Sequence, residues 1–201
     1  MKIKKPQIKK RDLIELFVVI TLFSVIYFTG SQAEVFGKVQ QVVLKTGVMN
    51  ANSLDEDEYL KATYDFKVRD ESGKIIDAET LRGKTIFINI WATWCPPCVA
   101  EMPSINELYK DFADNEDIVF LMIAEDKDFE VSKAWIKRKE LDLPIVELIT
   151  PLPDLYETGV VPTTFVISPK EEVVVSKTGM ANYDTRRFRK LIRKLDQQKA
   201  N

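Results

Sequence analysis

Trp94-Cys95-Pro96-Pro97-Cys98 is the stretch that decides the fold, and it contains both cysteines of the 201-residue chain. The stretch before it, Thr85–Trp91, is apolar enough for a buried strand, and residues 97–112 have the pattern of a helix. Two thiols separated by two residues can close a small disulfide and reopen it with little backbone movement. A Cys-X-X-Cys pair where a strand turns into a helix is typical of a dithiol redox site.

A purely structural disulfide is the alternative explanation for this cysteine pair, especially in an oxidising compartment. Such a staple would close a gap of only two residues. It would restrain the unfolded chain very little, because loop-closure entropy grows with loop size. The spacing therefore favours redox chemistry.

The charges of the chain are unevenly distributed, although its net charge is only −2. Residues 1–12 carry six basic side chains against one acidic one, which leaves 23 basic and 30 acidic residues in the remainder. An acidic body argues against nucleic-acid binding, which needs a basic surface. We interpret residues 1–12 as a basic cytoplasmic N-terminus.

Residues 13–30 are predicted to form a transmembrane anchor or a signal segment. Their strongly apolar part, 16–28, is short for a spanning helix, and Ser31 and Ala33 suit a cleavage site. Adding residues 13–15 brings the segment near the ~20 residues that a spanning helix needs. We favour a single-pass anchor in the inner (cytoplasmic) membrane, with the rest of the chain on the extracytoplasmic, periplasmic side.

The remaining chain is predicted to divide into three parts. Residues 31–61 form a juxtamembrane helix and an acidic linker, and one face of that helix carries Val35, Val39, Val42 and Val43. Residues 62–196 alternate strands and helices, then add a hairpin and a last helix, and 197–201 form a tail. That order predicts an α/β sandwich around one mixed sheet.

Two segments of this domain resemble a known family. They are Asn89–Cys98, followed by Glu101 and Pro103, and Val161-Pro162-Thr163-Thr164-Phe165. Together they resemble the TlpA/ResA-like branch of the thioredoxin-fold thiol-disulfide oxidoreductases, over about residues 62–195. The resemblance implies a thioredoxin-like three-layer sandwich with a mixed central sheet, preceded by an N-terminal membrane-anchor helix.

We expect Cys95, the more exposed cysteine at the mouth of the turn, to attack the substrate, and Cys98 to resolve the mixed disulfide. A helix N-terminus lowers the pKa of a thiol. Neither Pro96 nor Pro97 has an amide hydrogen to donate to the Cys95 sulfur, and the chain has no histidine. We therefore predict a moderately stabilised thiolate and a reducing pair.

Glu101 is the predicted proton-handling group. Asn89 stands where thioredoxin has an aspartate, and an amide cannot exchange protons in this way. Glu101 lies three residues after Cys98 at the edge of an apolar helical stripe, so partial burial should raise its pKa. The family resemblance points to the same glutamate. The alternative is an ordinary solvent-facing glutamate.

The predicted substrate-binding residues are Trp94, Pro96, Val161 and Pro162. We expect the Val161–Pro162 peptide bond to be cis, which would place the Val161 backbone beside the dithiol. That backbone could pair with an extended substrate segment. An ordinary trans turn proline is the alternative. Trp91 is expected in the core and Trp94 on the contact surface.

The leading functional hypothesis is an extracytoplasmic enzyme that reduces disulfides in exported proteins. Cysteines of apocytochrome c are one candidate substrate. The resemblance implies a membrane-embedded electron donor. We expect no cofactor and no metal. The alternatives are a disulfide-donating oxidase, a thiol peroxidase and a metal-binding chaperone of the same fold. Two thiolates supply only half of a tetrahedral metal site, and the sequence neighbours of Cys95 include no arginine of the kind a peroxidase uses.

Overall fold

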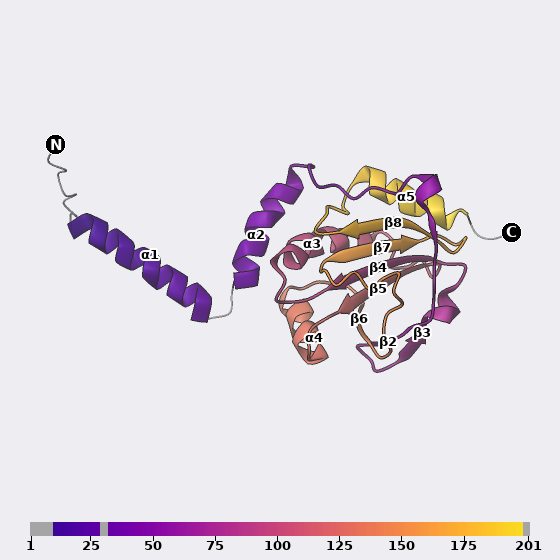
Figure 1. Ribbon diagram of the computed structural model, residues 1–201, viewed down its shortest axis with the longest axis horizontal. Coiled ribbons are helices and arrows are strands. Elements are labelled where there is room, and N and C mark those ends of the chain that lie inside the picture. Colours follow the sequence, from indigo (N-terminus) through magenta and orange to yellow (C-terminus); the bar gives the residue numbers. More distant parts are fainter. Residues whose placement is uncertain (1–9, 29–31, 199–201) are drawn as a thin grey trace.

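The computed structural model describes residues 10–28 and 32–198 (Figure 1). Two helices, α1 (Lys10–Phe28) and α2 (Gln32–Lys45), precede an α/β domain. Most of the predicted basic N-terminus, residues 29 and 30 of the predicted anchor and most of the predicted tail lie outside the described residues.

Helix α1 covers most of the segment that was predicted to cross a membrane. It begins with charged side chains, and Arg11 and Glu15 form an ion pair of 3.3 Å one turn apart. No helix within residues 10–28 and 32–198 is both long enough and apolar enough to span a membrane. The predicted membrane-anchor helix is therefore not confirmed: the first turns of α1 carry charges, and residues 16–28 are the uncharged part of that helix.

Eight strands form one mixed sheet in the order β1-β8-β7-β4-β5-β6-β2-β3. Strands β4, β5 and β6 run parallel, while β7 pairs antiparallel with both β4 and β8. The central strand β4 is buried along its whole length, as its apolar sequence predicts. The strand bounds are β1 (Leu60–Lys61), β2 (Lys67–Asp70), β3 (Ile75–Asp77), β4 (Thr85–Trp91), β5 (Ile118–Ala124), β6 (Ile145–Leu148), β7 (Thr163–Ile167) and β8 (Glu172–Thr178).

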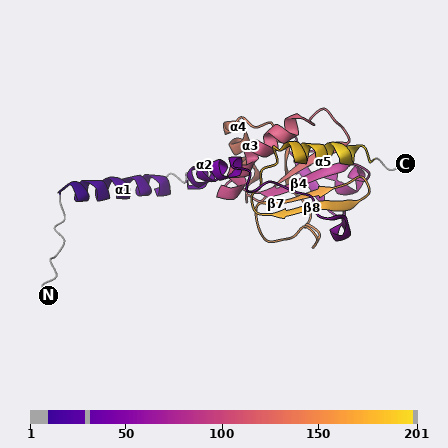
Figure 2. The same ribbon diagram turned by 90° about the horizontal axis from the view of Figure 1, so that it is seen from above.

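Three helices, α3 (Pro96–Lys110), α4 (Phe129–Arg138) and α5 (Arg186–Asp196), lie on one face of this sheet (Figure 2). They share one core with Phe87 and Trp91 of β4. The opposite face packs on a second core, which holds Tyr64, Phe66 and Tyr156. In the described part of the chain this second covering layer has no long helix. It consists of loops and the short 3-10 helix η2 (Ala78–Leu81); the other 3-10 helix, η1 (Glu56–Glu58), precedes β1.

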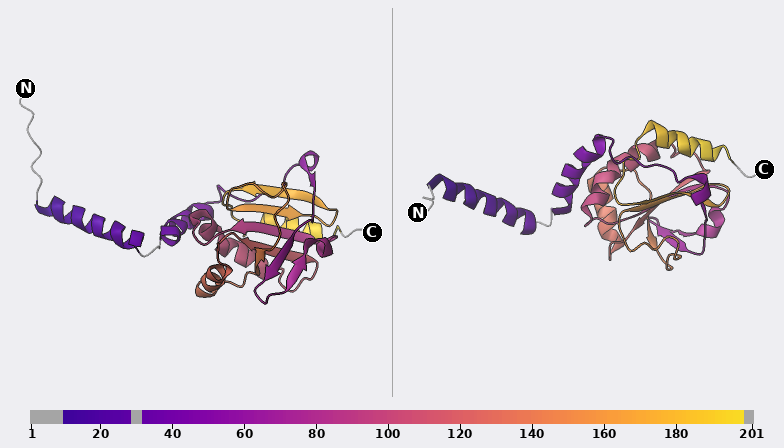
Figure 3. Two further views of the ribbon diagram at one scale, coloured as in Figure 1. Left: turned by 60° about the horizontal axis from the view of Figure 1, so that its bottom comes forward. Right: turned by 45° about the horizontal axis from the view of Figure 1, so that its top comes forward.

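Helix α2 packs against α3, the helix that carries the dithiol (Figure 3). Its buried residues are Ala33, Gly37 and Leu44. The valines that the sequence pattern placed on one face, Val35, Val39, Val42 and Val43, are on the exposed side instead. The small residues decide which side docks, because they allow the two helix backbones to approach closely.

Further contacts tie the N-terminal segment to the domain. Glu34 of α2 forms ion pairs of 2.9 Å with Arg138 and with Lys139 at the end of α4. In the predicted linker, the amide of Ala51 donates to the carbonyl of Asn182 at 3.1 Å. These contacts fix α2 and the following residues beside the first turn of α3.

Candidate dithiol site

Strand β4 and helix α3 position the two cysteines. Cys95 caps the N-terminus of α3, and prolines occupy the first two helical positions, where the missing amide hydrogen costs little. Cys95 and Cys98 form a disulfide with their Cα atoms 5.3 Å apart. The predicted strand–dithiol–helix arrangement is therefore confirmed.

The Cys95 sulfur lies between two backbone groups. The amide of Cys98 donates to it at 3.2 Å, and the carbonyl oxygen of Val161 lies 3.6 Å away. Cys95 is more exposed than Cys98, as predicted, but at 3% against 0% both are buried in the disulfide form. The prolines contribute no donor. Among the described residues, the amide that reaches the sulfur is that of Cys98, the third residue of the helix, which is a usual partner of an N-cap side chain.

The loop before β7 contributes the second side of the site. The Val161–Pro162 bond is cis, as predicted, and Val161 is the residue whose carbonyl faces Cys95. Trp94 is 62% exposed, whereas Trp91 is fully buried. Trp94 and Val161 also line an adjoining cavity of about 380 Å³ that reaches to Tyr156. The roles of Trp94, Pro96, Val161 and Pro162 in binding substrate stay predictions.

Glu101 is fully buried beneath this surface, not solvent-facing. Its Oε1 accepts a hydrogen bond of 2.8 Å from the side-chain Nδ2 of Asn89. Its Oε2 accepts one of 3.0 Å from the backbone N–H of Ala181. Burial raises the pKa of Glu101 to about 8, against the opposing effect of these two donors and of the charge on Lys177. The helical stripe predicted partial burial, and the actual burial is complete.

Two buried residues near Glu101 were not foreseen from the sequence. Thr164 Oγ1 accepts from the Asn89 side chain at 2.8 Å and from the Tyr183 hydroxyl at 2.6 Å. Burial, together with the nearby charge of Glu101, raises the pKa of Tyr183 well above its ordinary value. Asn89 inside an apolar strand was a signal that a buried polar partner existed, but Tyr183 belongs to no motif.

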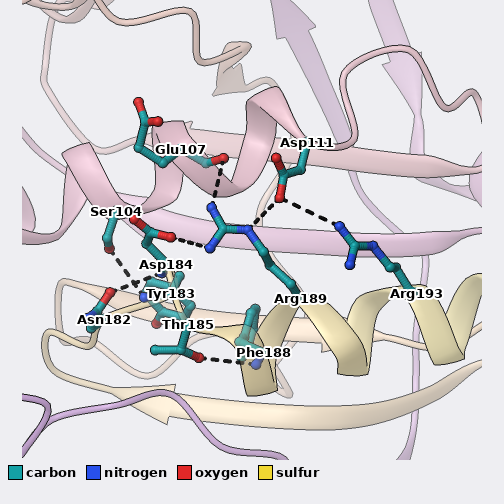
Figure 4. Close-up of polar contacts among 10 residues, drawn as sticks. All are labelled: Ser104, Glu107, Asp111, Asn182, Tyr183, Asp184, Thr185, Phe188, Arg189 and Arg193. Carbon is teal, nitrogen blue, oxygen red and sulfur yellow. Dashed lines mark hydrogen bonds and ion pairs between the residues drawn. The ribbon is translucent and has the colours of Figure 1, made fainter.

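The loop that carries Tyr183 is held against α3 by polar contacts (Figure 4). The amide of Tyr183 donates to Ser104 Oγ at 3.2 Å. Arg189 of α5 reaches both Asp111 and Asp184 with its guanidinium group. These contacts fix the position of Tyr183 relative to Glu101.

The described residues, 10–28 and 32–198, contain no group of three or more His, Cys, Asp or Glu side chains arranged to hold a metal ion.

Residues 60–176 match the sequence model of the AhpC/TSA family. The chain belongs to this family. Over 115 residues it is 35% identical to a thiol-disulfide oxidoreductase ResA of Bacillus cereus. That match covers 57% of this chain and 66% of the relative, so the chain spans just under two thirds of that protein's length. The ResA of Halalkalibacterium halodurans is 32% identical over 130 residues, which cover 64% of this chain and 73% of the relative.

The chain is also similar to a solved structure. The thiol:disulfide interchange protein of Chlorobium tepidum TLS, described as a thioredoxin family protein, superposes with a TM-score of 0.54 at 26% identity. The superposition covers 71% of this chain and 99% of that structure. The predicted thioredoxin-like α/β fold with a mixed sheet and the predicted resemblance to ResA are thus confirmed.

Proposed function

We propose that this AhpC/TSA-family protein is a thiol-disulfide oxidoreductase that acts by dithiol exchange at Cys95 and Cys98. One observation carries the proposal: a disulfide closes across the first turn of α3, with the Cys98 amide donating to the Cys95 sulfur. A helix N-terminus and an amide donor both stabilise a thiolate, which is the attacking species in disulfide exchange.

The exchange proceeds in two steps from the reduced dithiol. The Cys95 thiolate attacks one sulfur of the substrate disulfide, forms a mixed disulfide and releases the other substrate sulfur as a thiolate, which takes up a proton. The Cys98 thiol loses its proton and attacks the Cys95 sulfur. This closes the Cys95–Cys98 disulfide and releases the second substrate thiol. Two electrons pass from the dithiol to the substrate.

Glu101 would accept the proton that Cys98 must lose in the second step. It follows Cys98 by one helical turn, and no solvent reaches either side chain. A buried base with a pKa of about 8 is suited to exchanging a proton with a thiol near neutral pH. Asn89 and the Ala181 amide would hold the carboxylate until it takes up this proton.

The substrate would be an extended segment of an exported protein. Trp94 and Val161 border an apolar cavity beside the dithiol, and under this proposal the partly buried Pro96 and the buried Pro162 shape the backbone around it. Backbone groups of Val161 can pair with a strand laid across them. Cysteines of apocytochrome c are one candidate substrate.

The location that we propose is extracytoplasmic, with electrons supplied by a membrane-embedded donor. It rests on the order of the N-terminal segments, a basic stretch at 1–12 followed by an apolar one at 13–30. Under this proposal residues 13–30 direct export and tether the domain to the membrane.

The test is the equilibrium redox potential of the Cys95–Cys98 pair, measured by alkylation across a dithiothreitol series, together with reduction of a disulfide-bonded test protein. We expect a redox potential of about −270 mV. The Cys98→Ser variant should accumulate the mixed disulfide with the substrate. A potential near about −120 mV would instead make the protein a disulfide donor. Peroxide consumption without disulfide reduction would favour a thiol peroxidase.

A further inference from the structure

Four fully buried side chains form a continuous polar chain under the dithiol: Tyr183, Thr164, Asn89 and Glu101. Tyr183 donates to Thr164, and the amide nitrogen of Asn89 donates both to Thr164 and to Glu101. The three bonds measure 2.6 to 2.8 Å. The chain therefore links β4, β7 and the loop before α5 to the carboxyl group on α3.

In this arrangement Asn89 is held on one side only. Within the described part of the protein, its Oδ1 has no hydrogen-bond partner. The two ends of an amide have nearly the same shape, so a rotation by 180° exchanges donor for acceptor without moving the surroundings. The rotation would bring the two N–H groups of Asn89 to the place where Oδ1 has no partner in the part of the chain that the structure describes, so it costs the two hydrogen bonds that Nδ2 now donates.

The observed orientation suits a charged Glu101, because a carboxylate only accepts hydrogen bonds. A protonated Glu101 needs an acceptor for its O–H. Rotating the Asn89 amide would bring Oδ1 to the place of Nδ2, which lies 2.8 Å from both Glu101 Oε1 and Thr164 Oγ1. The Oδ1 could then accept from Glu101 and from Thr164, whose hydroxyl can donate as well as accept.

We propose that Thr164 and Asn89 are positioning residues that keep Glu101 hydrogen-bonded in both of its protonation states, through a rotation of the Asn89 amide. Tyr183 donates to Thr164 in both states and holds its hydroxyl in place. The inference deepens the proposed function, since it rests on Glu101 carrying a proton for the dithiol.

Few other charges face Glu101. Lys177 on β8 favours its charged form. Tyr183 stays neutral near neutral pH, because burial raises its pKa well above the ordinary value. Cys98 lies one turn earlier on α3 and does not titrate while the disulfide is closed. In the oxidised protein, Glu101 is thus the group of this cluster that titrates near neutral pH.

The Thr164 hydroxyl should stabilise the protein more when Glu101 is charged than when Glu101 is neutral. Without it, a charged Glu101 leaves a buried N–H of Asn89 with no acceptor, which is costly. When Glu101 is protonated and the amide is rotated, the Asn89 N–H groups have lost both acceptors whether or not the hydroxyl is present, so its removal costs only one donor to Oδ1. Thr164→Val should therefore raise the pKa of Glu101 above that of the unmodified protein.

The experiment is a titration of the full chain in its disulfide form, following the side-chain carboxyl carbon of Glu101 and the side-chain NH₂ of Asn89 by NMR. We expect Thr164→Val to raise the Glu101 midpoint by about one pH unit. Tyr183→Phe should shift it less, and the Asn89 NH₂ signals should move with the same midpoint as the carboxyl carbon.

The matched control is Thr85→Val. Thr85 is also fully buried in β4, and its Oγ1 has no hydrogen-bond partner among the described residues. It should leave the Glu101 midpoint unchanged. Three results would each overturn the proposal. The Glu101 midpoint could be unchanged in Thr164→Val, it could shift more in Tyr183→Phe than in Thr164→Val, or the Asn89 NH₂ signals could stay constant while Glu101 titrates. These titrations need no exchange activity, so they test the hydrogen-bonded chain alone. The proposed function is tested separately, by whether Glu101→Gln alters the pH profile of disulfide exchange.

Discussion

Gly37 of α2 lies directly against Val99 of α3, so closely that a Cβ on Gly37 would sit 2.8 Å from Val99 Cγ1 and 3.1 Å from the carbonyl oxygen of Pro96. Pro96 and Val99 belong to the first helical turn after Cys95. The helix that follows the apolar N-terminal segment therefore forms part of the support of the dithiol helix. It also limits access to that side of α3.

Replacing Gly37 with alanine tests this contact, because the sign of the change in the free energy of unfolding depends on whether α2 is docked. In an undocked helix, glycine to alanine stabilises by about 1 kcal/mol. In the docked helix the added methyl group overlaps Val99, and overpacking costs about 1–3 kcal/mol. We expect Gly37→Ala to lower the free energy of unfolding, and hydrogen exchange of the α2 amides to become faster.

Val39→Ala is the control, because Val39 lies on the exposed side of the same helix. It should leave both the unfolding free energy and the exchange of α2 nearly unchanged. A Gly37→Ala protein that is more stable than the original would mean that α2 does not dock on α3.

Arg189 is predicted to stabilise the loop that carries Tyr183. Its guanidinium group joins Asp184 of that loop to Asp111 at the end of α3 (Figure 4), and its side chain is only 22% exposed. Arg189→Ala should lower the free energy of unfolding by about 1 kcal/mol, measured by urea denaturation. Arg189→Lys should recover only part of this, because an ammonium group lacks the planar fork that spans two carboxylates. Equal stability of all three proteins would remove Arg189 from the support of this loop.

Trp94 is predicted to contribute binding energy for protein substrates without setting the redox chemistry. It is exposed next to Cys95 and borders the apolar cavity. Trp94→Ala should raise the KM for a disulfide-bonded substrate roughly tenfold, as loss of an aromatic anchor does. The redox potential should not change. Ile75→Ala, at an exposed position of the edge strand β3, should leave KM unaltered; a matching rise there would mean that Trp94 has no special role.

The dithiol and its framework could be predicted from the sequence because local patterns determine them. The apolar run Thr85–Trp91 favours a buried strand, and the prolines after Cys95 suit the first turn of a helix. The cis bond before Pro162 followed from the family motif. These features depend on residues that are neighbours in the chain.

The support of the site could not be predicted, because it depends on residues far apart in the sequence. The loop of Ala181 and Tyr183 bonds to Glu101 on α3 and to Thr164 on β7, which are 80 and 19 residues away in the sequence. Gly37 looked less informative than the valines around it, although its missing side chain decides the docking of α2. Tyr64 lies buried beneath the sheet, three residues before β2 begins at Lys67, and it packs there in the second core.

Glu101 should make the stability of the oxidised protein depend on pH. Its pKa is about 8 in the folded state, against an ordinary value of 4.5. The folded state therefore binds the proton more tightly than the unfolded state does. The stabilising contribution of the protonated form is complete below about pH 4.5 and is lost as the pH rises through about 8. We expect the free energy of unfolding to fall by a few kcal/mol across this window.

Glu101→Gln should remove this fall, because glutamine has a similar shape and does not titrate. Rotation of the Asn89 amide would let it bond to either end of the new side chain. The variant should be more stable than the original protein above about pH 8 and similar to it near pH 4.5. Unfolding curves of the two disulfide forms, measured at several pH values, provide the comparison. Parallel pH profiles would mean that Glu101 has an ordinary pKa in the folded protein, and with it the case for Glu101 as the proton acceptor of Cys98 would fail.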